Sequence, residues 1–531
     1  MPSEPIEAEF VRPPALTLGQ EEEFRQLEQE GPLSTSTLGS AATSLKAIEE
    51  GYKKEGVKIV SFEPGSGEDP REFPKFKKWY ITITTSFLCL AVALGSAIVT
   101  GDMTGPTKEF GASQEIVNLT VTCFVIGFGV GPLFFAPLSE IAGRTPIYIA
   151  SMFLYFIFTL PSALADNVTT LVVARQIAGL AASAPMCNVG GSIADIWAVE
   201  ERGIPMAIFS FTIFMGPCLG PLIGGFIGQE VGWRWLYWVL FIFSGLCFAL
   251  TLFIPETLAP VILRKKAAKL RKETGDNSYT TLEELERKPL TTTLWVALSR
   301  PIIMLMTEPI VILFSFYLSF VYALLSFAEI RGFSEGMTGV TFVSIMLGIG
   351  FAMCLLPIQE KVYAKATRNG TFPEARLYGM MFGSAYDLFP SPSDHIAHLS
   401  FPTNRWLPTS LFIFAFTGAY EWVHWIGPCI SGVLFGFSMI LIYVSANSYI
   451  VDSYSAYAAS AMAAKTLLRS EVGAMVPLFV NQMFHNMGFQ YAGLLLALIA
   501  VAITPIPFVF FKYGERIRRR STRATQDVRK R

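Results

Sequence analysis

The chain has 531 residues with 41 basic and 42 acidic side chains, so its formal net charge is -1 and gives no electrostatic argument for a nucleic-acid partner. Hydrophobic residues make up 52% of the chain and charged residues only 16%. Together with a mean hydropathy of +0.45, this composition excludes an ordinary soluble domain and indicates a polytopic membrane protein.

The N-terminal segment is polar and poor in aromatic side chains. Such a segment cannot bury enough apolar surface to fold, so we predict a disordered tail at residues 1–78. It has no apolar core after a basic start, and we therefore expect no cleaved signal peptide. Three lysines precede Trp79 and Tyr80, and this basic and aromatic collar is typical of an entrance to the membrane.

Twelve stretches approach or reach the roughly 20 apolar residues that a membrane-crossing helix needs. Six precede a long charged stretch, at residues 79–100, 116–138, 146–164, 171–193, 204–227 and 235–254. Six follow it, at residues 302–327, 337–357, an interrupted ninth within 377–418, 426–448, 455–483 and 489–511. We predict an all-α membrane protein with six-helix bundles at 79–255 and 301–511, a cytosolic linker at 256–300 and a basic tail at 512–531.

The ninth stretch is interrupted by a polar segment. Residues 377–385 and 407–418 are each too short to span, and residues 386–406 between them hold two aspartates, two histidines, an arginine and three prolines. Irregular polar backbone at membrane depth is tolerated only where protein or a water-filled cavity covers it. Two interpretations stay open: residues 386–406 are an anomalous insertion from a translated intron or similar gene-model fault, or they are a genuine extended loop.

Basic residues predict the orientation of the chain. Lysine and arginine gather in the loops on the side of the N-terminus, with nine of them between residues 264 and 300 and more in the tail from residue 512. The opposite loops hold little beyond Lys108, Arg234 and Arg331. Because cytosolic loops carry an excess of basic residues, we predict that both termini are cytosolic.

The fifth span contains the pattern G-P-x-x-G-P-x-x-G-G, formed by Gly216, Pro217, Gly220, Pro221, Gly224 and Gly225. Glycines at every fourth position share one helix face, so another backbone can approach closely there. Each proline removes a main-chain donor and loosens the helix. This combination suits a moving part, while plain helix packing is the alternative that the pattern leaves open.

Charged side chains in or beside the spans are the next candidates for function. Glu140, Gly143 and Arg144 follow the second span, where an acid, a glycine and an arginine in a tight turn can hold two helices and release them. Arg175 lies inside the fourth span, where burying a charge in the membrane costs free energy. Such an arginine is usually functional, and the alternative is a salt bridge that only holds helices together. The eleventh span carries Lys465, Arg469 and Glu471, to which the sequence assigns no role.

The seventh span holds Glu308 beside Pro309. A low-dielectric surrounding disfavours a charged carboxylate, so this side chain could hold a proton near neutral pH and exchange it as a cavity opens. The alternative is an acid at a helix end within reach of the lipid headgroups. Polar positions in the fourth, seventh and tenth spans could line such a cavity, namely Asn188, Tyr317, Tyr322 and Asn447.

These motifs resemble those of the major facilitator superfamily. Its inner-loop pattern G-x-x-x-D/E-R-x-G-R/K is matched at Glu140, Gly143 and Arg144 and departs at Ala136 and Ile141. The glycine and proline pattern of the fifth span resembles the motif of that family's antiporters. W-R-W at 233–235 and P-E-T at 255–257 are similar to fungal drug:proton antiporters with twelve spans.

The resemblance covers residues 77–513 apart from 386–406 and implies the major facilitator fold, which is two six-helix bundles around a central cavity. It also implies roles for single residues. Arg175 would couple transport to protons, and Glu308 is the second candidate for this role on the separate argument given above for the seventh span. Asp195 would pair with Arg144 when the cytosolic side is shut. The residues of this conformational switch would be Glu140, Gly143, Arg144, Asp195, Glu201 and Arg202.

We therefore expect a proton-coupled secondary transporter in the plasma membrane, monomeric, that exports drugs, toxins or polyamines by alternating access. No Walker A pattern occurs, so we expect no site that binds and hydrolyses a nucleotide. The seven cysteines form no C-x-x-C pair, so we expect no metal site. We also expect no cofactor and no nucleic-acid partner. An importer or symporter of the same fold and a non-transporting receptor stay open as alternatives. A membrane enzyme is a more distant one.

Overall fold

The computed structural model describes residues 57–63, 65–198, 201, 203–285, 290–323, 335–366, 373–381, 403–418, 420, 423–454, 458–521 and 524. They divide into two compact units, one made of the described residues up to Ser66 with Pro260–Arg287, and one made of Gly67–Ala259 with the described residues from 290 onward. Predictions for residues 1–56, Arg202, the side chain of Tyr322 and residues 382–402 lie outside the described residues.

The smaller unit holds two short strands and two helices. Its elements are β1 (Lys58–Ile59), α10 (Ala259–Thr274), β2 (Tyr279–Thr280) and α11 (Leu282–Leu285). The strands pair in parallel, and Lys58 Nζ lies 2.9 Å from Asp276 Oδ2. The end of the segment predicted to be disordered is thus ordered at β1, because main-chain hydrogen bonds with β2 replace the apolar core that the segment lacks.

The larger unit begins with the helices that we call the N-half. After η1 (Pro70–Glu72) they are α3 (Lys75–Ala97), η2 (Ile98–Gly101), α4 (Thr104–Phe110), α5 (Gln114–Ala142), α6 (Arg144–Ala163), α7 (Val168–Ile196), α8 (Gly203–Val231) and α9 (Trp233–Thr251). Gly143 at φ 105° ends α5, and Gly232 at φ 92° separates α8 from α9. A residue with a side chain is strained at such angles, so these glycines allow sharp turns between long helices.

The remaining helices of this unit form what we call the C-half. They are α12 (Leu290–Thr307), α13 (Pro309–Ala323), α14 (Glu335–Ala366), η4 (Pro373–Leu377), α15 (Tyr378–Met381), α16 (Thr403–Gly418), α17 (Ile426–Ser453), α18 (Ala458–Met487), α19 (Phe489–Ile503) and α20 (Ile506–Arg520). The last four residues of the predicted insertion, 403–406, belong to α16.

The all-α membrane class is confirmed. Nine helices among the described residues are long and apolar enough to cross a bilayer, and α12 with α13 make a bent tenth candidate. The described part of the ninth span contributes the shorter apolar helix Trp406–Gly418. The eleventh span is present as α18, whose three charged side chains lower its hydropathy. Every expected span therefore has a helical counterpart, although crossing by all twelve stays a prediction.

The seventh expected span differs from the prediction of one continuous helix. The chain bends by 92° between Leu298–Thr307 and Pro309–Leu318, with Glu308 at the break. Pro309 has no main-chain N–H and occupies the first position of α13, which is where a proline is best tolerated in a helix. Hydropathy alone could not reveal this bend, because both arms are apolar.

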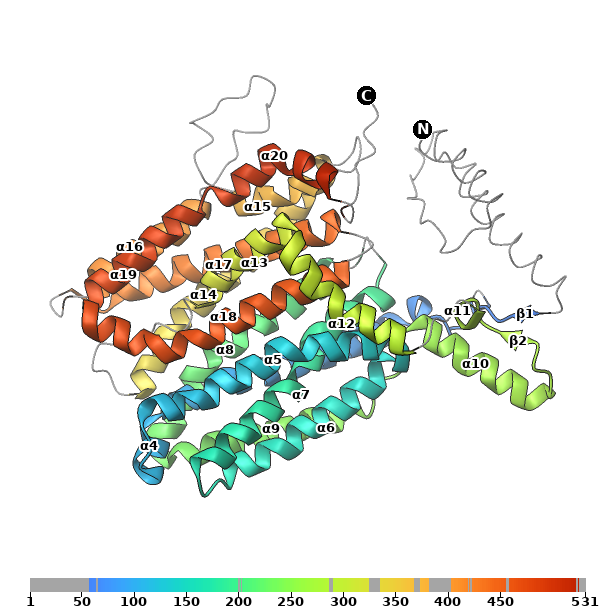
Figure 1. Ribbon diagram of the computed structural model, residues 1–531, viewed down its shortest axis with the longest axis horizontal. Helices are drawn as coiled ribbons and strands as arrows, with labels where there is room; N and C mark the ends of the chain where they lie inside the picture. Colours follow the sequence, from blue (N-terminus) through green and yellow to red (C-terminus); the bar gives the residue numbers. More distant parts are fainter. Residues whose placement is uncertain are drawn as a thin grey trace. The chain divides into compact units, whose positions relative to one another are not determined.

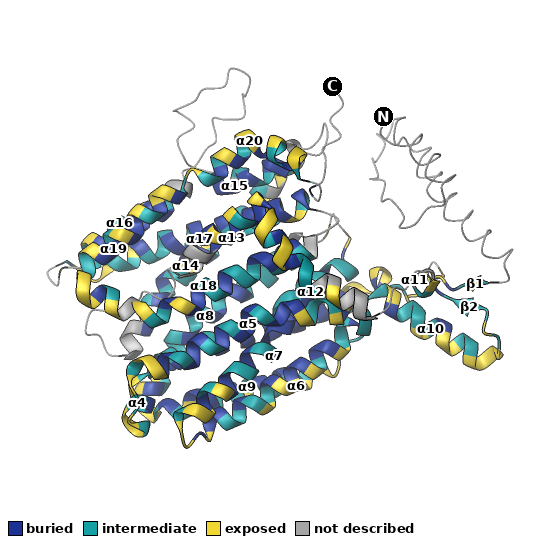
Figure 2. Cartoon of the chain, in the orientation of Figure 1, coloured by how far each residue is buried: buried dark blue, intermediate teal, exposed yellow. Residues whose placement is uncertain are grey.

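The two halves contact each other through α5 against α18 and α8 against α14, and Figure 1 shows α5 lying along α18. Within the N-half, α5 packs on α7 and α8 packs on α3. Exposed and buried positions mix along the membrane helices, as Figure 2 shows. Large apolar side chains such as Ile242, Leu347 and Leu498 are exposed, which suits contact with lipid.

The glycine face of α8 is a contact surface, as its spacing predicts. A Cβ atom added at Gly220 would lie 2.6 Å from Ala97 Cβ on α3, and one at Gly216 would collide with Ala93. A Cβ atom at Gly224 would collide with the Ile98 carbonyl of η2, and one at Gly101 of η2 would collide with the main chain of Gly224 and Gly225. Pro217 and Pro221 lie inside α8, which is nevertheless one helix of 29 residues. Close backbone contact between α3 and α8 therefore depends on the missing side chains.

Candidate functional site

A charged cluster lies where α5 ends and α6 begins. Arg144 Nε lies 3.4 Å from Asp195 Oδ2 on α7. Its Nη1 atom donates to Ser139 Oγ at 2.7 Å, and Ser139 Oγ donates to Asn188 Oδ1 at 2.8 Å. Both Ser139 and Asn188 are fully buried. We call these four residues the N-half charge cluster, and it joins the end of α5 to α6 and α7.

The P-E-T turn after α9 completes this cluster. Glu256 Oε1 accepts a hydrogen bond from the main-chain N–H of Arg144 at 2.9 Å and from those of Thr257 and Leu258 at 3.0 and 3.1 Å. Thr145 Oγ1 donates to the Pro255 carbonyl at 3.0 Å. The first N–H groups of α6 have no partner within the helix, and the glutamate accepts a hydrogen bond from one of them. Its negative charge also interacts favourably with the positive end of the helix dipole.

The predicted switch residues are only partly brought together. Arg144 and Asp195 pair, and Gly143 has the positive φ that the turn needs. Glu140 is exposed at the end of α5 and forms no ion pair with Arg144. Glu201 is also exposed.

Arg175 is buried at the centre of the N-half, with 2% of its surface exposed. Its Nη2 atom donates to the Gly95 carbonyl of α3 at 2.8 Å, and Nε donates to the Thr120 carbonyl of α5 at 3.4 Å. Its guanidinium carbon lies 4.0 Å from the ring centroid of Phe124. No carboxylate among the described residues pairs with it, so main-chain dipoles and an aromatic face stabilise this charge.

Glu308 is 4% exposed at the bend between α12 and α13. Its Oε2 atom accepts a hydrogen bond from Tyr454 Oη at 2.9 Å, and Tyr454 directly follows α17. The carboxyl group is therefore enclosed by protein in this arrangement. A rearrangement of the bend would change its environment, which is what a group that takes up and releases a proton requires.

A second charged network in the C-half was missed by the sequence analysis. Asp452 Oδ2 accepts from Arg376 Nε at 2.8 Å and from Tyr363 Oη at 3.0 Å. Burial and the adjacent Asp452 raise the pKa of Tyr363 to about 12, so Tyr363 stays a hydrogen-bond donor. Glu374 and Arg518 form an ion pair that is 1% and 2% exposed. An acid late in the tenth span, opposite a basic loop, was the available signal.

At the other end of the N-half, Glu109 of α4 holds the start of α9. Its carboxylate accepts from Arg234 Nη2 at 2.5 Å and from Trp233 Nε1 at 2.8 Å. These hydrogen bonds keep the pKa of Glu109 below its ordinary value of 4.5. The W-R-W residues thus tie a loop to a membrane helix.

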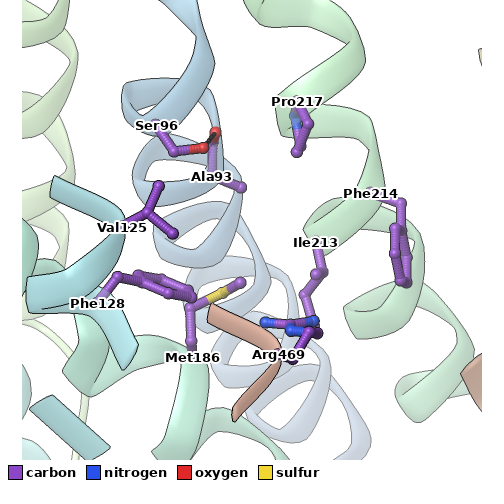
Figure 3. A pocket seen from close by; sticks show the side chains of 9 residues that line it. All are labelled: Ala93, Ser96, Val125, Phe128, Met186, Ile213, Phe214, Pro217 and Arg469. Carbon is purple, nitrogen blue, oxygen red and sulfur yellow. Dashed lines mark hydrogen bonds between the residues drawn. The ribbon is translucent and has the colours of Figure 1, made fainter. Parts of the chain in front are cut away.

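A small cavity lies between the two halves (Figure 3). Five helices line it: α3, α5, α7 and α8 of the N-half and α18 of the C-half. The lining side chains are Ala93 and Ser96, Val125 and Phe128, Met186, then Ile213, Phe214 and Pro217, and finally Arg469. Three of the predicted cavity residues, Asn188, Tyr317 and Asn447, are described but do not line it.

Two residues of the C-half that do not line the cavity, Lys465 and Tyr443, are connected to it through Phe214. Lys465, which is fully buried on α18, donates to Asn447 Oδ1 at 2.7 Å. Its Nζ atom lies 4.7 Å from the ring centroid of Tyr443, and the ring of Tyr443 meets that of Phe214 edge to face at 4.7 Å. Asn447 therefore binds a lysine instead of lining the cavity, and the sequence analysis assigned no role to the charges of α18.

Among the described residues there is no group of three or more His, Cys, Asp or Glu side chains that could hold a metal ion. A small, mostly apolar cavity between two helical halves, with charged side chains at the turns, is typical of a membrane transporter.

Comparison with known proteins identifies the family. The model of the Major Facilitator Superfamily matches residues 83–477. The transporter paaT of Penicillium rubens is 42% identical over 489 residues, which are 90% of this chain and 85% of that protein. The multidrug transporter TPO3 of Candida glabrata is 36% identical and covers 89% of this chain and 73% of its own length.

The fold agrees with this assignment. The proton:xylose symporter XylE has a TM-score of 0.58 at 15% identity, covering 83% of this chain and 96% of that structure. The chain belongs to the major facilitator superfamily. It is accordingly a membrane transporter and not an enzyme.

Proposed function

We propose that the protein exports small organic molecules across the plasma membrane, as a monomer, in exchange for protons. The observation that carries this proposal is the cavity between the halves, whose walls come from four N-half helices and from Arg469 of α18. A site shared by two halves can open to either side when the halves rock against each other. Relatives named as a multidrug transporter, an efflux pump and a polyamine transporter support export, with drugs, toxins or polyamines as candidate substrates.

Direction and orientation rest on the distribution of charge. The basic loops on the side of both termini favour a cytosolic position for them. The N-half charge cluster would then lie at the cytosolic end, where breaking the pair between Arg144 and Asp195 would accompany opening. The glycine face of α8 would let this helix move against α3 while remaining in close contact.

Proton coupling is assigned to Glu308 and Arg175. Glu308 has a carboxyl group at a bend, bound to a tyrosine of another helix. Arg175 has a buried charge bonded to main-chain carbonyls of α3 and α5. Any movement of α7 against these helices must change how that charge is stabilised. Both are therefore placed to link protonation to the arrangement of the helices.

The test is a flux assay on purified protein in liposomes under an imposed pH gradient, with a panel of organic compounds. We expect at least one compound to accumulate on the side from which protons flow, and collapse of the gradient by an ionophore to stop it. Movement of compounds with the protons would identify a symporter instead. Absence of any gradient-driven flux from an active, correctly folded preparation would contradict the proposal.

A further inference from the structure

The wall that α18 contributes to the central cavity is cationic. Arg469 is the one charged side chain among the residues that line it, and Figure 3 shows its guanidinium facing the same space as Ile213, Met186 and Phe128. Arg469 is 4% exposed, so its charge is held away from bulk water. A charge in this position interacts strongly with whatever occupies the cavity, since the surroundings are of low dielectric constant.

A second cation reinforces the first. Lys465 is one turn before Arg469 on α18 and is fully buried. Both lie over the ring of Tyr443, with Lys465 Nζ at 4.7 Å and Arg469 Cζ at 5.7 Å from its centroid. Like charges four residues apart on a helix repel each other, and burial strengthens the repulsion. An anion in the cavity would reduce that cost, whereas a cation bound there would increase it.

The acid on the same helix is directed at a neighbouring helix and not at the cavity. Glu471 faces α5, where a side chain placed on Gly129 would come 3.0 Å from its Oε1 atom. It is not among the lining residues. The partners of Lys465 in this layer are the neutral Asn447 and the ring of Tyr443. Charge and shape therefore differ across the cavity, with Arg469 on one side and an apolar wall on the other, while Lys465 shares the ring of Tyr443 with Arg469 outside the lining.

The apolar wall sets the rest of the ligand's chemistry. Phe128, Met186 and Phe214 offer aromatic and thioether surface that suits a flat hydrophobic body. A guanidinium binds a carboxylate or sulfonate through paired hydrogen bonds, which a lysine ammonium cannot reproduce in geometry. Phe214 also contacts Tyr443, so the apolar wall and the cations form one continuous surface.

We propose that the central cavity binds small organic anions with an apolar or aromatic body, and that Arg469, supported by Lys465, selects them over cations such as polyamines. This inference rests on the proposed function, because it names the substrate class of the same transport site. It narrows the expectation of drugs, toxins or polyamines to ligands whose charge is negative in the bound state.

Binding by the full-length protein in lipid nanodiscs tests this inference without any gradient. The probes are naphthalenesulfonate and naphthylmethyl-trimethylammonium, which have similar aromatic bodies and fixed opposite charges. We expect the anion to bind and the cation to bind at least about tenfold more weakly, since a charged hydrogen bond is lost. Equal or tighter binding of the cation by the wild-type protein overturns the proposal, and this comparison needs no variant.

Variants then locate the selectivity. Arg469→Gln should weaken anion binding about tenfold or more and leave binding of the cation equal or improved, whereas Arg469→Lys should retain part of the preference. Lys512→Gln, in α20 outside the cavity lining, is the matched control and should change neither affinity. Unchanged anion affinity in a folded Arg469→Gln protein overturns the assignment to this residue.

The same preparations separate this inference from the proposed function. Anion-selective binding without flux under a pH gradient would contradict proton-driven export and support the selectivity assigned here. Gradient-driven export of the cationic probe or of spermidine, with no export of the anion, would support export and overturn the selectivity.

Discussion

Single side chains in this transporter carry buried charges that are stabilised by different partners. Arg175 is bonded to main-chain carbonyls, Glu308 accepts from a tyrosine hydroxyl, and Arg144 pairs with Asp195. Arg175 has no carboxylate partner among the described residues, so its charge does not belong to an ion pair of the kind that only holds helices together. The stabilisation of these charges therefore depends on the arrangement of neighbouring helices, and a change of that arrangement changes the preferred state of the charge.

The first residue-scale prediction concerns Glu308. Glu308→Gln keeps the size of the side chain and the acceptor for Tyr454 Oη but cannot exchange a proton. We expect pH-driven accumulation of substrate to fall by about tenfold or more, because coupled proton transfer is lost, while exchange of substrate between equal pH values persists. Flux in liposomes with and without a pH gradient measures both quantities.

Tyr454→Phe is the matched control, since it removes the hydrogen bond and leaves the carboxyl group. It should retain coupling with a changed pH dependence. Full coupling in the Glu308→Gln protein would remove Glu308 from the proton pathway.

The second residue-scale prediction uses the lowered pKa of Glu109. A carboxyl group whose pKa is lowered on folding adds stability above its unfolded pKa, here near 4.5, and this stability is lost as the pH falls through the folded pKa. Glu109→Gln should therefore lower the thermal stability slightly at pH 7, by about 1 kcal/mol or less because the pair with Arg234 is half-exposed.

Thermal unfolding of both proteins between pH 7 and pH 3 checks this. The difference between them should be constant near neutrality and shrink below about pH 4.5, where the carboxylate becomes protonated. A difference that grows on acidification would contradict the sign of the effect.

At the scale of elements, α8 and α18 have the most consequential surfaces. The glycines of α8 bring two backbones together, and Arg469 of α18 lines a cavity. The glycine face of α8 depends on residues four apart in one helix, so helical periodicity alone reveals it. The position of Arg469 at the cavity depends on which neighbours the fold places around α18, and no local pattern contains that information.

The close contact between α8 and α3 gives an element-scale prediction. Gly220→Ala adds a Cβ atom 2.6 Å from Ala97 Cβ, so the helices must separate and stability should fall by about 1–3 kcal/mol. Transport should fall with it. Gly350→Ala in α14 is the control, because its added Cβ meets nothing within 4 Å and alanine favours a helix by up to about 1 kcal/mol. Thermal unfolding in detergent compares them, and equal effects would contradict the packing argument.

Several elements could be predicted from the sequence because their cause is local. Long apolar runs place α5, α7 and α17 close to their observed bounds, and the glycine spacing predicts the contact face of α8. The bend at Glu308 was missed, since apolar residues continue on both sides of it. Pairing of β1 with β2 was missed because more than 200 residues separate the strands, and short segments of this kind have no apolar alternation.

The candidate site was predicted less completely than the fold. The pair of Arg144 and Asp195 was anticipated through a motif. The contribution of Lys465 and Arg469 was not, since a charge in an apolar run indicates function without indicating which ligand or helix it faces. Asn188 was expected in the cavity but lies beside Arg144, where its buried amide oxygen accepts from Ser139.

The whole molecule must separate its halves if it works by alternating access. Thr122 Oγ1 of α5 donates to the Ala474 carbonyl of α18 at 2.9 Å, and Asn118 Nδ2 donates to the Pro477 carbonyl at 3.1 Å. These contacts join the halves near the start of α5, the end remote from the N-half charge cluster. Opening at that end must break both hydrogen bonds, whose individual contribution of about 1 kcal/mol is small enough for a reversible motion.

This contact predicts that a covalent bond between the halves stops transport. In a Thr122→Cys/Ala474→Cys protein, oxidation should abolish gradient-driven flux, and reduction should restore it, because α5 and α18 can then separate again. Ser410→Cys/Ser431→Cys is the matched control: Ser431 Oγ donates to the Ser410 carbonyl at 2.8 Å, and both belong to the C-half. The control should continue to transport when oxidised, because its cross-link stays within one moving body. Undiminished flux in the fully cross-linked first protein would mean that the halves do not part along α5 and α18, and the rocking mechanism would have to be abandoned for this transporter.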